Sequence, residues 1–128
     1  MANRDSGNVS MYTVDASTGT LTANGTIAAR NSPYSVTVDP TGRFAYAATG
    51  TGVSMYTINA DTGALMANGN IFTVAGRSIA VDPTCRFVYV ANNGSANVSM
   101  FTINPSTGAL TSNGTIAAGT SPTSITVY

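Results

Sequence analysis

The sequence predicts an all-β chain built from a repeated sheet of four short strands, on three observations. The segment Val9–Thr13 (VSMYT) recurs at 53–57 and, as VSMFT, at 98–102, so that a block of 44 to 45 residues repeats along the chain. The 128 residues include no Lys, Glu, Gln, His or Trp and are rich in Thr, Ser, Gly and Asn, a composition that favours strands and turns. No segment combines helical periodicity with capping residues.

Each repeat divides into four strands. The first strand, predicted at 35–38, 78–81 and 124–127, ends in its first two copies at an Asp-Pro-Thr turn. The second strand, at 43–48 and 86–91, is apolar on both faces, which indicates a sheet buried on both sides. A Gly/Asn-rich loop leads to the third strand, at 98–103 in the last repeat. The fourth strand is rich in Thr and is expected near 110–117.

Four short strands in 44 residues, with both faces buried, are typical of a β-propeller blade, because each blade needs a neighbour on either side. The rungs of a β-helix, the main alternative, are much shorter. We expect one partial propeller domain with blade boundaries near 1–32, 33–76, 77–121 and 122–128. Two blades are then complete and a third is split between the termini. Because a propeller usually has four to eight blades, we expect the ring to be completed by self-association through blade faces and terminal strands, or within a longer chain.

A family resemblance rests on the repeat residues themselves. The segments are Val38–Phe44 (VDPTGRF), Tyr89–Asn92 (YVAN), Asn97–Asn104 (NVSMFTIN) and Ser106–Leu110 (STGAL). Together they resemble the lactonase-type seven-bladed β-propellers, which include bacterial 6-phosphogluconolactonases and the YVTN-repeat proteins of cell surfaces. The resemblance covers nearly the whole chain. It implies blades of this fold and, for the enzymes of the family, a site built from polar loop residues on one face of the ring.

The composition argues against several classes of function. The formal net charge is zero, whereas nucleic-acid partners require basic patches. No apolar run reaches the ~20 residues that span a bilayer, so we expect no membrane insertion. The missing His and Glu remove most acid–base and metal chemistry, and we expect no catalytic residue, metal or cofactor. Cys85 is the only cysteine, which excludes an intramolecular disulfide and leaves the redox compartment open.

A candidate ligand site lies in the loops that follow the second and fourth strands, because these emerge on one side of the ring, at its mouth. Arginines there can hold a carboxylate or phosphate, and asparagines can bind hydroxyl groups. The candidates for a small polar or anionic ligand are Arg30, Asn31, Tyr34, Arg77, Asn92 and Asn93. Asp39 and Asp82, by contrast, are interpreted as caps of the Asp-Pro turns.

The leading functional hypothesis is a non-catalytic propeller module for recognition or structure. The low charge and the polar, Thr-rich composition favour an extracellular or cell-envelope location. One alternative is a fragment of a lactonase-type sugar-lactone hydrolase whose working residues lie in other blades. A second alternative is an engineered or selected partial propeller that assembles as a homo-oligomer.

Overall fold

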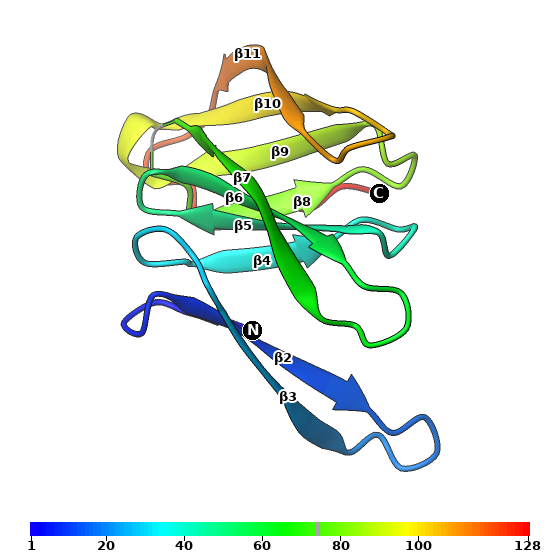
Figure 1. Ribbon diagram of the computed structural model, residues 1–128. Helices are drawn as coiled ribbons and strands as arrows, with labels where there is room; N and C mark the ends of the chain where they lie inside the picture. Colours follow the sequence, from blue (N-terminus) through cyan, green and yellow to red (C-terminus); the bar gives the residue numbers. More distant parts are fainter. Residues whose placement is uncertain (74) are drawn as a thin grey trace.

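The computed structural model describes residues 1–73 and 75–128 and places the strands in three antiparallel sheets, one above another (Figure 1). The first sheet contains β1 (Ala2–Asn3), β2 (Asn8–Val14) and β3 (Leu21–Ala28), paired in that order. The second contains β4 (Ser35–Val38), β5 (Phe44–Thr49), β6 (Gly52–Ile58) and β7 (Leu65–Phe72). The third contains β8 (Ser78–Val81), β9 (Phe87–Asn92), β10 (Asn97–Ile103) and β11 (Leu110–Ala117), with a 3-10 turn η1 (Asn93–Ser95) before β10. Within the described residues, no helix is long and apolar enough to span a membrane.

The three sheets are blades of a partial β-propeller, as the repeat predicts. The middle sheet is covered on both faces, and every residue of β5 is buried. Tyr46 of β5 points to the third sheet, where its hydroxyl donates to the carbonyl of Gly108 at 2.9 Å. Tyr56 of β6 points to the first sheet and donates to the carbonyl of Ala28 at 3.0 Å. Burial raises the pKa of both phenols above the ordinary value, so each remains a hydrogen-bond donor.

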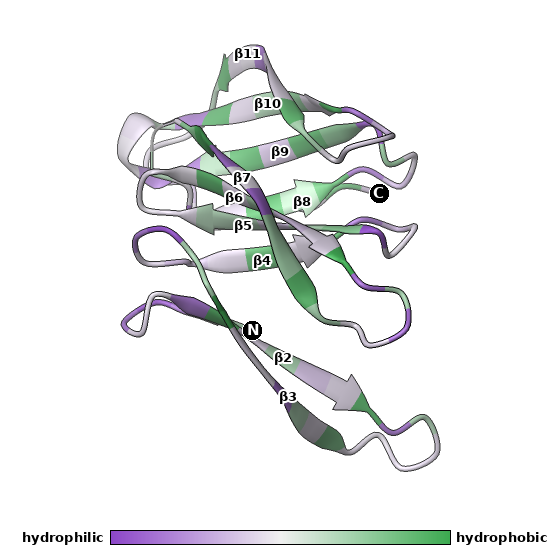
Figure 2. Cartoon of the chain, viewed as in Figure 1, coloured by the Kyte–Doolittle hydropathy of each residue, from purple (hydrophilic) through white to green (hydrophobic). Residues whose placement is uncertain are grey.

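Hydrophobic residues lie mainly in the strands, and the most hydrophilic residues lie mainly in the connections between strands (Figure 2). Two apolar clusters fill the two gaps between sheets, one on each face of the middle sheet. Burial of these side chains, at roughly 25 cal/mol per Å² of apolar surface, holds the blades together. The sheets approach each other at β4 and β8, which makes these the inner strands, and the outer strands β7 and β11 twist away (Figure 1).

The Asp-Pro turns are closed by their aspartates. The buried Asp39 carboxylate accepts backbone N–H bonds from Arg43 at 2.9 Å and Phe44 at 2.8 Å, and the Thr41 hydroxyl donates to its other oxygen. In the next blade the carboxylate of Asp82 makes the equivalent bonds. These contacts agree with the interpretation of both residues as turn caps.

The Asn-Gly pairs of the three repeats form β-bulges in the outer strands. Between Ser54 and Tyr56 the register of β6 against β7 shifts by one residue, opposite Asn68 and Gly69, and the other two blades repeat this shift. The side chain of Asn68 thereby turns toward the next blade and donates to the carbonyl of Thr107 at 2.6 Å. The bulge therefore contributes a bond between blades.

Two predicted details differ from the structure. The second strand lies one residue later than predicted, at β5 (Phe44–Thr49) and β9 (Phe87–Asn92). The predicted first strand at 124–127 does not form, and residues 118–128 contain no strand. The physical reason is pairing. β4 and β8 each pair with the strand that follows them in the chain, whereas residues 124–127 pair with no strand in this structure.

Candidate functional site

The two ends of the stacked sheets carry different charges. The loop end is defined as the end of the sheets that carries the connections β1–β2, β3–β4, β5–β6, β7–β8 and β9–β10, together with the segment after β11. The turn end is the opposite end, which carries the remaining connections. Three of the five arginines and one of the five aspartates lie at the loop end: Arg4, Arg30, Arg77 and Asp5. All the others lie at the turn end. The loop end is therefore the positive end of a chain whose net charge is zero, a feature that strand order and charge together could have predicted.

Tyr34 lies at the centre of a cluster at the loop end. It precedes the inner strand β4, as Arg77 precedes the inner strand β8, so the two residues occupy equivalent positions in neighbouring blades. The Arg77 guanidinium lies over the Tyr34 ring, 4.4 Å from its centroid, and the Arg4 guanidinium lies 5.4 Å from the same centroid. Stacking on a ring orients a guanidinium and leaves its N–H edge available to an anion. Three blades thus bring two cations to one aromatic platform.

Asn93 completes this cluster from the third blade. It begins the 3-10 turn η1, and its side-chain amide donates to the carbonyl of Pro122 at 3.4 Å. With Tyr34 and Arg77 it lines an open pocket of about 240 Å³, which Gly76 and Gly94 also line. The structure therefore brings together three of the predicted candidates, with Arg4 as a fourth member of the cluster.

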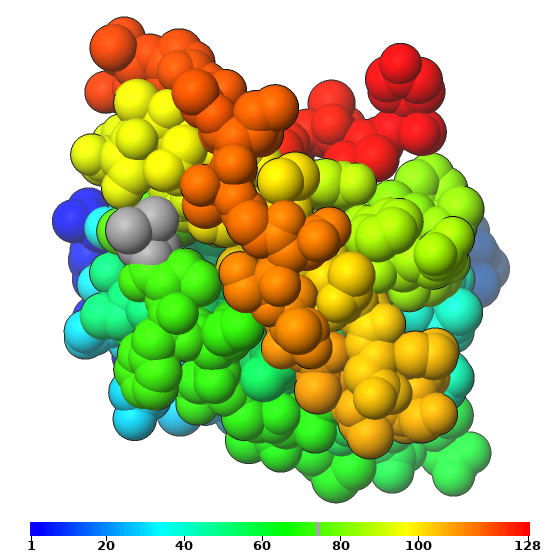
Figure 3. Space-filling model, turned by 90° about the horizontal axis from the view of Figure 1, so that it is seen from above, coloured from blue at the N-terminus to red at the C-terminus, as the bar shows by residue number. Residues whose placement is uncertain are grey.

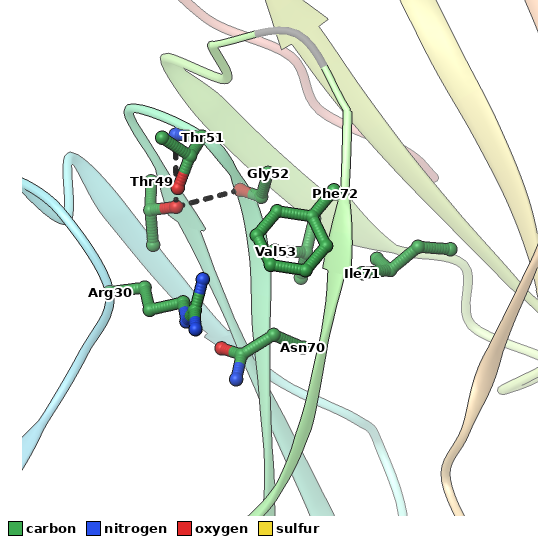
Figure 4. Close-up of a pocket in the computed structure, with 8 residues that line it drawn as sticks. All are labelled: Arg30, Thr49, Thr51, Gly52, Val53, Asn70, Ile71 and Phe72. Atoms are coloured by element: carbon green, nitrogen blue, oxygen red, sulfur yellow. Dashed lines mark hydrogen bonds between the residues drawn. The ribbon is translucent and has the colours of Figure 1, made fainter.

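Arg30 and Asn31 lie in the β3–β4 connection and have other neighbours. The Arg30 guanidinium lies 4.8 Å from the centroid of the Phe72 ring, beside the β5–β6 connection and Asn70 (Figure 4). The space enclosed by these residues leaves no room for a water molecule. Asn31 is exposed, and its carbonyl accepts the N–H of Gly50 at 2.8 Å. Arg30 thus adds positive charge to the loop end without sharing the pocket of Tyr34.

Asn92 is buried inside the third sheet, away from the loop surface. Its amide donates to the side chains of Asn97 at 2.7 Å and Ser99 at 2.8 Å. Asn3 makes the same pair of bonds in the first blade, to Asn8 and Ser10. The repetition marks Asn92 as a brace between the second and third strands, and its amide is not open to a ligand.

The turn end has a larger hollow, of about 430 Å³, between the Asp-Pro turn of the third blade and Ile103. Its one charged lining residue, Arg86, belongs to a contact that repeats from blade to blade. The Arg86 guanidinium lies 5.1 Å from the centroid of the adjacent Phe87 ring, and Asp82 accepts the amides of its own turn. Among the described residues, no group of three His, Cys, Asp or Glu side chains could hold a metal ion. The loop end, with its unrepeated arginines, is therefore the better candidate for a binding site.

Comparison with known proteins gives the same fold. Residues 24–127 match the family described as lactonase, seven-bladed β-propeller. A candidate 6-phosphogluconolactonase from Bacteroides fragilis superposes with a TM-score of 0.88 at 22% identity. The periplasmic gluconolactonase of Pseudomonas aeruginosa superposes with a TM-score of 0.81 at 19% identity. Hydrazine synthase of Kuenenia stuttgartiensis superposes with a TM-score of 0.62 at 21% identity. No curated protein sequence matches the chain.

These structures are much longer than the chain. The alignments cover 95%, 91% and 91% of this chain, but only 36%, 36% and 33% of the three proteins. The chain thus spans about a third of the length of the structures it resembles.

The family match corrects the function expected from the sequence. The leading hypothesis of a non-catalytic module is wrong, and the alternative of a lactonase-type propeller segment fits better, since the match covers most of the chain. That hypothesis rested on the missing His and Glu. A propeller draws its site from the loops of several blades, so residue types absent from three blades do not exclude catalysis. The chain belongs to the family of lactonases with a seven-bladed β-propeller fold.

Proposed function

We propose that the chain supplies three blades of a lactonase-type propeller that opens sugar lactones by hydrolysis. The match of residues 24–127 to the lactonase family carries this proposal. Two solved structures of similar fold bear the names of gluconolactone hydrolases, which supports a sugar lactone as the substrate class. The positive loop end supports an anionic group on the substrate or product.

The chemistry needs a site for anions. In lactone hydrolysis water adds to the carbonyl carbon, negative charge develops on the carbonyl oxygen, and the ring C–O bond then breaks to give a hydroxy acid. At neutral pH this acid is an anion. Guanidinium groups held in place before the reaction stabilise such charge. Arg77, oriented over Tyr34 beside the 240 Å³ pocket, is placed for this role, with Arg4 next to the same ring.

Asp5 is the candidate for a general base. Among the described residues it is the one acidic side chain at the loop end, and it is exposed next to Arg4 in the β1–β2 connection. A carboxylate can accept a proton from the attacking water and return it to the leaving alkoxide. The roles proposed are therefore anion binding for Arg4 and Arg77, orientation of both arginines for Tyr34, and proton transfer for Asp5.

The test measures hydrolysis of glucono-δ-lactone and of its 6-phosphate by the purified chain, in a pH-stat with the spontaneous rate subtracted. We expect turnover above the spontaneous rate, a raised KM for Arg77→Met and a loss of kcat for Asp5→Asn. Arg86→Met, at the turn end, is the matched control and should behave as wild type. Equal rates for the wild type and for Arg77→Met and Asp5→Asn would contradict the assignment to the loop end.

We also propose an extracellular or cell-envelope location. It is supported by the low share of charged residues, 8%, and by the polar character of the exposed connections. Fractionation of the source cells tests it, and recovery of the protein in the cytosol alone would contradict it.

A further inference from the structure

We propose that the two outer faces of this chain are the two halves of one blade–blade junction, and that two copies therefore associate head to tail. We call start face the side of the first sheet turned away from the second, and end face the side of the third sheet turned away from the second. The inference rests on contacts that the two interior junctions repeat, and it is independent of the proposed activity.

The first repeated contact is a hydrogen bond from an outer-strand asparagine. Asn24 donates to the carbonyl of Thr62 in the next blade at 2.9 Å, and Asn68 donates to the carbonyl of Thr107 at 2.6 Å. The third asparagine of this series is Asn113, which is exposed on β11. The first threonine of the matching series, Thr18, is exposed in the β2–β3 connection. End face and start face thus each hold one partner of a bond that the chain makes twice internally.

The apolar residues of the start face show the same relation. Tyr12 is 39% exposed and Leu21 is 61% exposed. Their counterparts in the following blades are better covered: Tyr56 and Phe101 are each 1% exposed, Leu65 is half-buried and Leu110 is 8% exposed. Side chains that are covered at the interior junctions are therefore uncovered on the start face.

The end face lacks a cover in the same way. In Figure 3, which looks onto this face, β9, β10 and β11 lie in view with no sheet above them. Ile116 is 60% exposed, and Tyr89 is half-buried, whereas its counterpart Tyr46 is fully buried. The residues through which the middle sheet contacts the third sheet recur on the end face. At the interior junctions, these residues pack against a surface of the same kind as the start face.

The C-terminal segment supplies the missing inner strand. The first sheet has three strands, and β1 forms its inner edge. In the other blades the residue before the inner strand donates to the second strand, from Tyr34 to the carbonyl of Ala48 at 2.9 Å and from Arg77 to Ala91 at 2.8 Å. The equivalent bond would run from Thr123 to Ala2 of a second copy. Ile125 already lies beside β8, with its N–H 3.2 Å from the hydroxyl of Ser78, as β8 lies beside β4.

The number of copies follows from closure. A head-to-tail contact repeats until the assembly closes or forms a filament. Closed propellers have four to eight blades, so two copies fall within this range and three copies do not. The resulting ring of six sheets has one sheet fewer than the seven-bladed rings of the family. We therefore infer a dimer with two identical junctions, in which the C-terminal segment of one copy lies along the short strand β1 of the other.

The experiment measures the molar mass of the purified chain by size-exclusion chromatography with light scattering over micromolar concentrations. Leu21→Arg changes the start face and Ile116→Arg changes the end face, and both residues are already exposed, so folding is not at risk. Met66→Arg is the matched control: Met66 is 53% exposed on β7 and belongs to neither face. We expect a dimer for the wild type and for Met66→Arg, and a Kd at least about 30-fold higher for each face variant. Circular dichroism verifies that all variants are folded.

Mixing the two face variants tests the head-to-tail geometry. An Ile116→Arg chain keeps an intact start face and a Leu21→Arg chain keeps an intact end face, so the mixture can form one wild-type junction. We expect the mixture to dimerise more tightly than either variant alone, while a chain with both substitutions stays monomeric. A wild-type monomer would overturn the proposal and assign the faces to further blades of a longer polypeptide. Larger open assemblies, or no recovery on mixing, would overturn the closed head-to-tail dimer.

Discussion

The turn end and the loop end of the same sheets are built in different ways. At the turn end, equivalent residues make the same contacts in successive blades. Arg43 lies 4.9 Å from the centroid of its neighbour Phe44, and Arg86 lies 5.1 Å from that of Phe87. The capping bonds of Asp82 likewise repeat those of its counterpart one blade earlier.

At the loop end, equivalent positions hold different residues, and the contacts join different blades. The position before the inner strand is Tyr34 in one blade and Arg77 in the next, and these two residues contact each other. Arg30, at the end of the first blade, lies over Phe72 at the end of the second. The comparison teaches that the repeated end stabilises each blade, which leaves the other end able to vary. Substitutions at the turn end should therefore reduce stability, and those at the loop end should change binding.

The largest loss of stability is expected for Gly108→Ala at the turn end. Gly108 has φ +73°, and a Cβ there would lie 2.3 Å from the Phe44 ring of the neighbouring blade. Its counterpart Gly63 has φ +69° with open space around it. Overpacking and a strained backbone together should destabilise Gly108→Ala by about 3 kcal/mol, against about 1 kcal/mol for Gly63→Ala. Urea unfolding of both variants measures the difference, and equal losses would contradict a tight junction at Gly108.

A smaller loss is expected for Asp82→Ala. The variant leaves the amides of Arg86 and Phe87, and the hydroxyl of Thr84, without their charged acceptor. Hydrogen bonds to a charged group contribute a few kcal/mol, so the free energy of unfolding should fall by about 2 kcal/mol. Asp5→Ala, an exposed carboxylate at the loop end, should change it by less than about 0.5 kcal/mol. The same urea titrations measure both, and an equal effect at the two ends would remove the distinction between them.

The parts of the fold that sequence analysis predicted are those set by local residue patterns. The Asp-Pro turns and the doubly buried second strands each depend on a few adjacent residues. The strand predicted at 124–127 is absent because residues 124–127 have no strand to pair with in this structure. The pattern of residues 124–127 resembles β4 and β8, but a strand also requires an edge to pair with.

The candidate site was predictable only in part, for a similar reason. Its position at the loop end follows from strand order, and Tyr34, Arg77 and Asn93 were identified in this way. The stacking of Arg4 on Tyr34 joins two blades, and no residue pattern around either residue indicates it. Asn92 resembles a loop asparagine in sequence, but β9 extends through it, and its side chain is buried. Whether Asn92 braces two strands or is open to a ligand depends on how far the strand β9 extends. The local sequence specifies the end of a strand poorly.

A smaller loss than that of Asp82→Ala is expected for Asp82→Asn, and it depends on pH. Although burial raises the pKa of Asp82, hydrogen bonds from Thr84, Phe87 and Arg86 lower it below the ordinary 3.8. The folded state therefore favours the ionised carboxylate, and this contribution is present at neutral pH and lost as the pH falls through the folded-state pKa. The exposed Asp15 acts in the same direction, because bonds from the Ser17 hydroxyl and nearby amides lower its pKa to about 2.

Asp82→Asn keeps an acceptor oxygen but removes the charge, so at pH 7 it should be about 1 kcal/mol less stable than wild type. The gap should narrow as the pH falls below 4, because the wild type alone loses the contribution of the ionised Asp82. Arg77→Met, at the loop end, should keep the pH dependence of the wild type. Urea titrations between pH 7 and pH 2.5 measure all three proteins. A constant gap between wild type and Asp82→Asn would mean that the turn is held by geometry alone, without help from the charge of its aspartate.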